Sequence, residues 1–571
     1  MRKYSILVLL CFFIHYAGAQ NTPENTPKVT ATSVATPSAY SNTLINYVRT
    51  WEPSMPTSDV NVVISESRTL SEVKQATQYL DGLGRPLQTV QKGISPQGRD
   101  LVVPVVYDIY GREQYKYLPY VQQSDNNSDG RFKTNPFVAQ KSFYQDNNLN
   151  PGVAGESVYY SQTEYEASPL SRVLKTYAPG NSWALGGGNR PVMNQYLVNT
   201  ASDSVRIWKA TAQIPTSTGS YGANQLYKNV TLDEAGSQVL EYKDKEGRVV
   251  LKKMQLAVTP GTAHTGWLCT YYVYDDSGNL VFVIPPKAVQ LIAGNWTVGT
   301  DIAAELCFSY QYDNRNRMIF KQVPGAGPVH MVYDVRDRLV FAQDAVQRSK
   351  STPEWLVTFY DELNRPMMTA IYKSASTRET LQQSMNTATS GTGTISYNFP
   401  AKADLYVNQY AGDSQFIATN SINFTEVFDS GNGATFDANI QPGGTSGTTT
   451  VAATNPLPGI SAVDLTPLTY TYYDNYDYTS KLPFENGDIS KPQAGNNPYA
   501  EALPGIPSTM INGLVTGTKV RVLGTDQWLT TSSYYDDKGR TIQVVSENSV
   551  GGRDVATSLY DFNGKVLSSY V

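Results

Sequence analysis

Histidine and cysteine are scarce in this sequence, and that scarcity disfavours most catalytic and metal chemistry. The 571 residues include three His and three Cys. A nucleophilic triad needs a base, and beyond the first twenty residues only His264 and His330 could supply one. A zinc site needs close pairs of ligands, whereas Cys269 and Cys307 stand far apart. We expect structural or solvated roles for both histidines, and neither a catalytic site nor a cofactor.

Charged residues and long apolar runs are also scarce. Charged residues make up 17% of the chain, and 45 basic against 50 acidic residues give a formal net charge of −5. This balance offers no basic stripe for nucleic acid. After the N-terminus, no stretch approaches the roughly 18 apolar residues of a membrane span. We therefore expect no nucleic-acid partner and no membrane span.

The N-terminus has the pattern of a signal peptide. Arg2 and Lys3 precede an apolar stretch over residues 6–14 and the small residues Ala17-Gly18-Ala19. Residues 1–19 are thus predicted to direct export, to the periplasm, the cell surface or the medium. Cys11 would leave with the signal, so stability must come from packing rather than from a disulfide framework.

The remaining composition predicts an all-β protein. Tyr is abundant, at 40 residues, and 43 Gly and 32 Pro indicate many short strands and turns. Helical stripes are scarce, and Thr377–Ala388 is the best short helix candidate. Residues 20–43 are predicted to be a flexible leader. Two repetitive β blocks, 44–375 and 466–571, flank a Gly/Thr-rich insertion at 376–465, in which SINFTEVF and ATFDANI read as a pair of strands around a Gly turn.

The β blocks contain a repeat of the form Tyr-Asp-x-x-Gly-Arg. Its nine copies have six Gly, two Asn and one Asp in the fifth position, and Tyr473-Asp474 is a degenerate further copy. Two of the nine carry one extra residue between Tyr and Asp. The turn residues are Asp81 and Gly84, Asp108 and Gly111, Asp244 and Gly247, Asp275 and Gly278, Asp313 and Asn316, Asp334 and Asp337, Asp361 and Asn364, Asp536 and Gly539, and Asp561 and Gly564.

The six positions are typical of a β-hairpin. Tyr ends the incoming strand, and Asp caps the turn with its own carboxylate. The fifth residue must adopt positive φ to form a bulge, and Gly, Asn and Asp are the residues that tolerate it. The Arg that follows starts the return strand, with a Tyr ring or a turn Asp as its expected partner.

With these copies and their flanking text, the chain resembles the YD repeats of the RHS family. The stretches QYLDGLGRPLQTVQKG, YDIYGREQYKYLPY, EYKDKEGRVVLKK and YYDDKGRTIQVVSEN are similar to the N-terminal region, a domain of unknown function, of large exported RHS-repeat proteins of the Bacteroidetes. The resemblance implies a β-sheet ribbon that spirals around a hollow interior. Such ribbons form shells that enclose a C-terminal toxin, or adhesive surface proteins.

The end of the chain departs from the shell-type pattern. The sequence stops seven residues after Gly564, without further repeats, a core segment or an effector. We expect no toxin or self-cleavage activity, and a bare sheet edge at VLSSYV that leads to self-association. The chain is then expected to be a fragment, or to need a downstream RHS-core or toxin polypeptide.

Four other patterns carry weaker hypotheses. Asp125-x-Asn127-x-Asp129-Gly130 begins like a calcium loop, but Pro136 stands where a Glu is required, which favours a solvated loop. Gly186-Gly187-Gly188 precedes no helix and is no phosphate cradle. The turn Asp residues could pair as glycosidase carboxylates, although each is needed to cap its turn. The many Tyr rings could bind sugars, although packing explains them more simply.

The two thiols are expected to stay unpaired. Cys269 lies six residues before Asp275, and Cys307 six before Asp313, so they occupy equivalent places in consecutive repeats. Equivalent places are two strands, about 9–10 Å, apart. A disulfide needs Cα atoms within about 7 Å. The sequence therefore predicts two buried free thiols.

These observations favour a non-enzymatic exported scaffold, the N-terminal part of a shell that encloses or displays an effector absent from this chain. A surface adhesin that binds carbohydrate or protein is the alternative. A glycoside hydrolase comes third.

Overall fold

The all-β prediction is confirmed by the computed structural model, in which about 40% of residues are in strands and 10% in helices. It describes residues 29–42, 45–54, 57, 59–388, 392–407, 410, 414–426, 428–454, 460, 462–495, 497, 499–549 and 551–571. The proposed signal peptide lies outside these residues. Among the residues it does describe, no helix is long and apolar enough to cross a membrane.

The chain divides into two compact units. Unit 1 contains residues 1–51, 74–195 and 231–237, and unit 2 contains residues 52–73, 196–230 and 238–571.

Within its described residues, unit 1 is built from two groups of strands and one helix, α2 (Pro136–Gln145). One group is a five-stranded sheet in the order β1-β2-β3-β4-β6, and in the other β5, β7, β8 and β9 pair antiparallel in turn. The strands are β1 (Asn46–Pro53), β2 (Val73–Leu80), β3 (Pro86–Gln91), β4 (Leu101–Pro104), β5 (Tyr115–Tyr117), β6 (Tyr120–Val121), β7 (Tyr160–Tyr165), β8 (Val173–Tyr177) and β9 (Val192–Val198).

The described part of the leader packs on unit 1 instead of being free. Residues 29–42 have no regular secondary structure. Even so, Val34 and Tyr40 contact a core cluster around Tyr117 and Phe137. The Val34 N–H also donates to the Tyr160 hydroxyl at 2.8 Å. A few apolar anchors therefore order a segment whose composition alone suggests flexibility.

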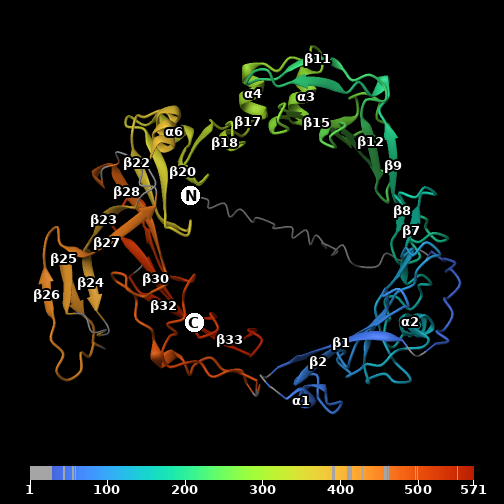
Figure 1. Ribbon diagram of the computed structural model, residues 1–571, viewed down its shortest axis with the longest axis horizontal. Helices are drawn as coiled ribbons and strands as arrows, with labels where there is room; N and C mark the ends of the chain where they lie inside the picture. Colours follow the sequence, from blue (N-terminus) through green and yellow to red (C-terminus); the bar gives the residue numbers. More distant parts are fainter. Residues whose placement is uncertain are drawn as a thin grey trace, which may run out of the picture. The chain divides into compact units, whose positions relative to one another are not determined.

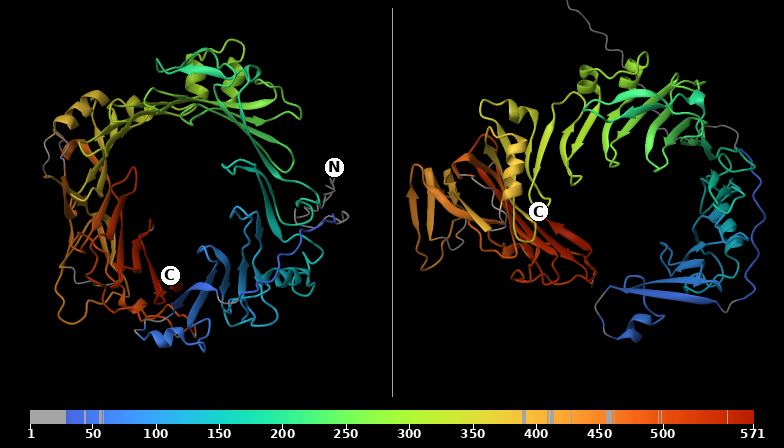
Figure 2. Two further views of the ribbon diagram at one scale, coloured as in Figure 1. Left: turned by 45° about the vertical axis from the view of Figure 1, so that its right-hand side comes forward. Right: turned by 45° about the horizontal axis from the view of Figure 1, so that its top comes forward.

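Unit 2 is dominated by one long series of antiparallel strands. Each strand from β13 to β22 pairs with the next, β22 pairs with β28, and the series continues to β33. Figure 2 shows the green to yellow strands lying side by side as a curved sheet. The strands are β13 (Gln238–Lys243), β14 (Val249–Gln255), β15 (Trp267–Tyr274), β16 (Leu280–Ile284), β17 (Phe308–Tyr312), β18 (Met318–Gln322), β19 (Val329–Tyr333), β20 (Leu339–Gln343), β21 (Glu354–Tyr360), β22 (Pro366–Lys373), β28 (Leu465–Tyr473), β29 (Val515–Arg521), β30 (Trp528–Tyr535), β31 (Thr541–Glu547), β32 (Arg553–Tyr560) and β33 (Val566–Tyr570).

Short helices lie in the connections of unit 2. The predicted helix is confirmed as α6 (Arg378–Thr387), which has Thr377 as N-cap and Ala388 as C-cap and buries Leu381 and Met385. Strand β12 (Tyr227–Leu232) lies beside β13 in the large sheet. The other elements of the connections are α1 (Val60–Ile64), β10 (Arg206–Lys209), β11 (Thr216–Ser220), α3 (Pro286–Ile292), α4 (Thr300–Leu306) and α5 (Ala345–Ser349), with 3-10 turns at Ala201–Asp203, Ala462–Asp464 and Asn486–Asp488.

The insertion leaves and re-enters the sheet between two neighbouring strands, because β22 pairs with β28. Its strands β23 (Thr392–Pro400) and β27 (Thr445–Thr454) are antiparallel. The Phe399 ring of β23 packs edge-on against Trp528 of the main sheet, with ring centres 5.1 Å apart. Figure 1 shows the other three strands as a separate small sheet, consisting of β24 (Lys402–Val407), β25 (Gln415–Phe424) and β26 (Asp437–Ile440).

The predicted pair of strands around a Gly turn is wrong in its direction. β25 and β26 are parallel, with Gln415 opposite Asp437. Strand β25 begins at Gln415, before the predicted strand SINFTEVF at residues 421–428. The long stretch between Phe424 and Asp437 returns the chain to the starting end of β25, and a connection of that length forms a crossover rather than a hairpin.

The degenerate copy at Asp474 is not a repeat turn. Its backbone has a φ of 69°, and β28 and β29 are joined by a long excursion over residues 474–514. This excursion covers the last strands, where Leu482 packs in a buried cluster with Tyr534, Ile542 and Val545. The apolar face of these strands is thus covered by a segment that precedes them. The prediction of a bare outer edge at β33 stays a prediction.

Candidate functional site

All nine predicted turns have the same local geometry. In each, the Asp N–H donates to the carbonyl of the sixth residue, and the fifth residue donates back to the Asp carbonyl. The Asp carboxylate also accepts the backbone N–H of the sixth residue, at 2.8–3.0 Å. The fifth residue has positive φ in every copy, from 58° at Asn316 to 85° at Gly278. At Asp108–Gly111 the turn forms although its flanking strands, β4 and β5, enter different groups of strands.

Each Arg in the sixth position joins its own turn to the next one. Its Nε donates to the turn Asp at 2.6–2.9 Å. Its guanidinium lies over the tyrosine that precedes the next turn, with 4.3–5.2 Å between Cζ and the ring centre. Each of these Arg residues therefore binds both of its expected partners, a turn Asp and a Tyr ring, at the same time. The pairs are Arg85–Tyr107, Arg112–Tyr165, Arg248–Tyr274, Arg317–Tyr333, Arg338–Tyr360, Arg365–Tyr473 and Arg540–Tyr560.

The tyrosine hydroxyl returns a second bond to the preceding hairpin. Tyr360, for example, donates to the Leu339 carbonyl at 2.8 Å, directly after Arg338. We call the contact between the sixth residue of one turn and the tyrosine before the next turn a joint. The same bond from the tyrosine hydroxyl recurs at the other joints of unit 2. Its members are Tyr274 to Val249, Tyr312 to Leu280, Tyr333 to Met318, Tyr473 to Pro366 and Tyr560 to Thr541.

Where Gly is replaced in the fifth position, the replacement adds a further bond between turns. Asp337 accepts from Arg317 at 2.9 Å, and Asn364 accepts from Arg338 at 3.0 Å. Asn316 accepts from Asn279 at 3.1 Å. These residues thus do more than tolerate positive φ, because each binds the sixth residue of the preceding turn.

The two copies with an extra residue do not place their tyrosines in these joints. Side chains alternate across a strand, so a shift by one residue turns the ring to the opposite face. Tyr79 and Tyr242 are both buried there. Tyr242 donates to the Asp203 carboxylate at 2.8 Å, and Tyr79 to the Gly130 carbonyl at 3.1 Å.

Sequence reasoning missed turns that lack the Tyr-Asp signature. Asp233 and Gly236 repeat the backbone bonds of the nine copies without Tyr or Arg. In a longer variant, Ser171 has a φ of 48° and Arg172 binds Glu166 through both carboxylate oxygens at 2.9 Å. The Asp-x-x-Gly spacing at residues 233–236 is enough to predict the first of these turns from the sequence.

Three of the turn carboxylates, those of Asp81, Asp108 and Asp313, have pKa values that favour the charged form. The backbone N–H of Arg85, with its guanidinium, holds the pKa of Asp81 below its usual value. Partial burial raises the pKa of Asp108 and Asp313, but hydrogen bonds from Arg112 and Arg317 outweigh it and lower both pKa values. A glycosidase acid needs a raised pKa, so these carboxylates have the opposite property.

Both histidines have structural surroundings. The His264 Nε2 lies 2.8 Å from the Tyr271 hydroxyl, and its ring contacts Trp296. Burial, with the nearby Lys253 and Arg206, lowers the pKa of His264 to about 4. Burial also lowers the pKa of His330 in β19.

A buried polar cluster lies beside His264, and its groups are satisfied within the protein. The Asp203 carboxylate accepts from Lys228 at 2.7 Å and from Tyr242. The Lys253 ammonium donates to the carbonyls of Asp203 and Thr262, at 3.2 and 2.9 Å. Burial lowers the pKa of Lys253 to about 8. Since these bonds join residues 200–203 to the sheet, the cluster ties the β10–β11 excursion in place.

The calcium-like loop of unit 1 surrounds a lysine. The Lys133 ammonium donates to Asp100 at 2.7 Å, to Asp129 at 3.1 Å and to the carbonyl of Asn126. Lys133 and Asp100 are both buried. The loop is therefore neither a calcium loop nor merely solvated, because a positive charge of the chain itself occupies its centre.

The Gly triplet belongs to a tightly packed loop that presents Trp183. The Gly188 N–H donates to the Asn181 carbonyl at 2.8 Å, and the Arg190 N–H to the Trp183 carbonyl at 3.1 Å. A Cβ at Gly187 or Gly188 would stand 2.1 or 2.0 Å from a backbone oxygen, so only glycine fits. As predicted, the loop leads into no helix; β9 follows it.

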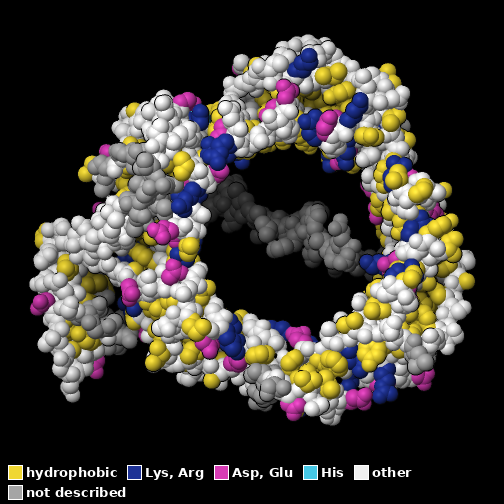
Figure 3. Space-filling model, viewed as in Figure 1, with side chains coloured by type: hydrophobic (Ala, Val, Ile, Leu, Met, Phe, Trp, Pro, Cys, Tyr) yellow, Lys and Arg dark blue, Asp and Glu magenta, His cyan; other side chains and the backbone are white. Residues whose placement is uncertain are grey.

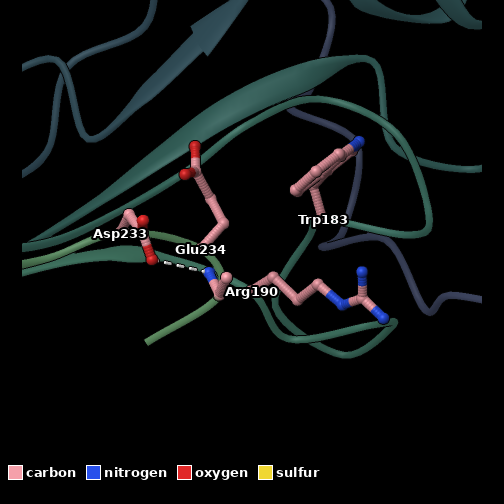
Figure 4. A pocket seen from close by; sticks show the side chains of 5 residues that line it. Trp183, Arg190, Asp233 and Glu234 are labelled. Carbon is pink, nitrogen blue, oxygen red and sulfur yellow. Dashed lines mark hydrogen bonds between the residues drawn. The ribbon is translucent and has the colours of Figure 1, made fainter. Parts of the chain in front are cut away.

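This loop and the Asp233 turn enclose a surface hollow of about 580 Å³ in unit 1. Its lining is Trp183, Arg190, Asp233, Glu234 and Ala235. Figure 4 shows the Trp183 ring and the Glu234 side chain on different sides of it, with Arg190 extended beneath. The dashed line marks the bond from the Ala235 N–H to Asp233, at 2.9 Å.

The two thiols are buried and free, as predicted. Burial raises the pKa of Cys269 to about 11 and that of Cys307 to about 12. Raised values make both thiols poor nucleophiles.

Comparison with known proteins gives one family match and a set of structural similarities. The family is a domain of unknown function, DUF6443, matched by residues 49–198. Crystal structures of TcdB2-TccC3-TEV and TcdB2-TccC3-Cdc42 are similar over 87% and 86% of this chain, at 15% and 14% identity and TM-scores of 0.37 and 0.34. A Photorhabdus luminescens Tc holotoxin pore is similar over 87%, at 14% identity and a TM-score of 0.34. This chain spans only 18%, 19% and 22% of those chains. No curated protein matches. Residues 49–198 thus match DUF6443.

Proposed function

We propose that this chain is an exported, non-enzymatic scaffold of the RHS/YD type that forms part of a wall enclosing another polypeptide. The joint between hairpins carries this proposal. The three recurring residues of the repeat, Tyr, Asp and Arg, are all used in bonds within a turn or between successive turns. The repeated residues therefore hold neighbouring hairpins together rather than carry out a reaction.

A joint of this kind supports an extended sheet of any length. Seven of the nine turns contact the next hairpin through an Arg that lies over a Tyr ring, so stability accumulates repeat by repeat. Long series of strands with a covered face are suited to forming walls. The proposed partner is a polypeptide such as an RHS core or effector, as the resemblance implies.

The surface charge agrees with a protein that does not bind nucleic acid. On the face shown in Figure 3, acidic and basic side chains are interspersed. A nucleic-acid surface would instead gather Lys and Arg into one stripe.

Protease protection tests the enclosing role. An unstructured, protease-sensitive segment is attached after Val571, and the same segment is inserted at the exposed turn between Gly443 and Gly444 as a control. If the wall encloses the segment attached at Val571, thermolysin should cut that segment at least about tenfold more slowly than the control. Equal rates, with both proteins folded, would contradict enclosure.

Export is proposed from the N-terminal pattern alone. Expressed in a bacterium with an outer membrane, the protein should leave the cytoplasm and begin at Gln20. Intact mass measurement of the exported protein tests this. Retention of residues 1–19 in a cytoplasmic product would overturn it.

A further inference from the structure

We propose that the hollow lined by Trp183, Arg190, Asp233 and Glu234 binds a neutral oligosaccharide. This inference does not depend on the enclosing role. The volume of the hollow, about 580 Å³, lies within the usual range for ligand sites.

The hollow presents an aromatic surface that the rest of the fold does not need. Trp183 is 40% exposed, whereas its neighbour Ala184 is buried in the core. The loop is held from both sides, since Asn181 accepts from the Ser157 N–H at 2.7 Å while its own N–H donates to Glu156. A rigid loop with a strict glycine requirement thus displays an indole to solvent, which suits stacking against the apolar face of a sugar ring.

The polar groups of the hollow are available for hydroxyl groups. Among the described residues, no ion pair or side-chain hydrogen bond engages the Arg190 guanidinium or the Glu234 carboxylate. Asp233 uses one oxygen, Oδ1, to accept the N–H groups of Ala235 and Ser237. Guanidinium donates and carboxylates accept, so together they match vicinal hydroxyls, which do both.

The mixed charge selects against charged ligands. Asp233 and Glu234 would repel an acidic sugar. Arg190, whose Cζ lies 6.0 Å from the centre of the Trp183 ring, would repel a cationic side chain that approached the indole. A neutral ligand meets neither penalty.

Affinity electrophoresis of the folded chain tests the proposal. The probes are soluble neutral polysaccharides (starch, xyloglucan, galactomannan and a β-glucan), with polygalacturonate as the charged probe. At least one neutral probe should retard the protein, and polygalacturonate should not. No retardation by any neutral probe, or stronger retardation by polygalacturonate, would overturn the proposal.

Variants then locate the site. Trp183→Ala and Glu234→Gln should each weaken the retarding affinity about fivefold or more, while Tyr406→Ala, an aromatic 66% exposed in the insertion, should leave it unchanged. Circular dichroism and melting temperature confirm that each variant is folded. Unchanged affinity in the folded Trp183→Ala protein would place binding elsewhere and refute the assignment. The protease protection result is not affected by either outcome, so the two proposals fail separately.

Discussion

At the scale of single residues, the positive-φ position of the turn is the most local feature of this protein. Gly247 has a φ of 82° and open space around its missing side chain. Gly247→Val should lower the free energy of unfolding by about 1–3 kcal/mol, since a β-branched residue is strained there. Gly247→Asn should cost much less. Urea unfolding of both variants measures the difference, and equal losses would argue against the turn geometry. Gly111 is a poorer choice, because the Arg85 guanidinium stands 2.7 Å from the position of its Cβ.

The Arg residues of the joints differ in burial, and so should the cost of replacing them. Arg338 is 8% exposed, binds the buried Asp334 and covers Tyr360. Arg338→Lys should destabilise by about 1–3 kcal/mol, because an ammonium cannot make the forked bonds. Arg85→Lys, at a side chain 36% exposed, should cost less than about 1 kcal/mol. The joint model predicts this order, and thermal unfolding would reveal a reversal.

His264 should titrate far below an ordinary histidine. Its pKa is lowered to about 4 mainly by burial. As the pH falls, the unfolded chain therefore takes up a proton at this histidine before the folded protein does. The neutral, buried ring contributes its full stability above about pH 6.5, and this stability is lost as the pH falls from about 6.5 to 4. NMR titration of the ring protons should give a value near 4. A midpoint above 6 would mean that the ring is solvated, and His264→Gln should flatten the pH dependence in this window.

At the scale of elements, the excursion over residues 474–514 stabilises the final strands by covering them. Leu482 of the excursion is buried against the final strands, and its carbonyl accepts the Tyr534 hydroxyl. Leu482→Ala should cost about 2–5 kcal/mol and accelerate amide exchange in β31 and β32. Leu523→Ala, at a residue 78% exposed, serves as the control and should change neither. If exchange rose equally in β13 and β14, the effect would be global rather than local to the excursion.

At the scale of the whole molecule, three of the repeated turns should make the protein sensitive to acid. The pKa values of Asp81, Asp108 and Asp313 lie below the ordinary value of 3.8, because hydrogen bonds favour the carboxylate. A lowered folded pKa contributes stability above the unfolded value, and this is lost as the pH falls through the folded values. Melting temperature should thus drop steeply below about pH 4. Asp313→Asn should lower the melting temperature at pH 7 and make the acid-induced drop smaller, and an unchanged acid profile would contradict this.

The sequence by itself determined the features that depend on neighbours along the chain. The turns at Asp81–Gly84 and its equivalents follow from an Asx cap and a residue that tolerates positive φ, within six residues. Helix α6 follows from its Thr377 cap and its buried Leu381 and Met385. The β class follows from composition, because no long helical stripe competes with it.

Only the tertiary structure decided which groups meet across the chain. The sequence left the Arg partner open, and the structure uses both, because the next Tyr comes alongside only when hairpins stack. In the sequence, Tyr79 and Tyr242 look equivalent to the tyrosines of the other copies, although a shift of one residue turns their rings to the other face of the sheet. Lys133 enters the calcium-like loop through its pairing with Asp100, and the hollow joins Trp183 to Glu234 from turns about fifty residues apart. Such contacts depend on how distant segments pack, and no local pattern encodes that.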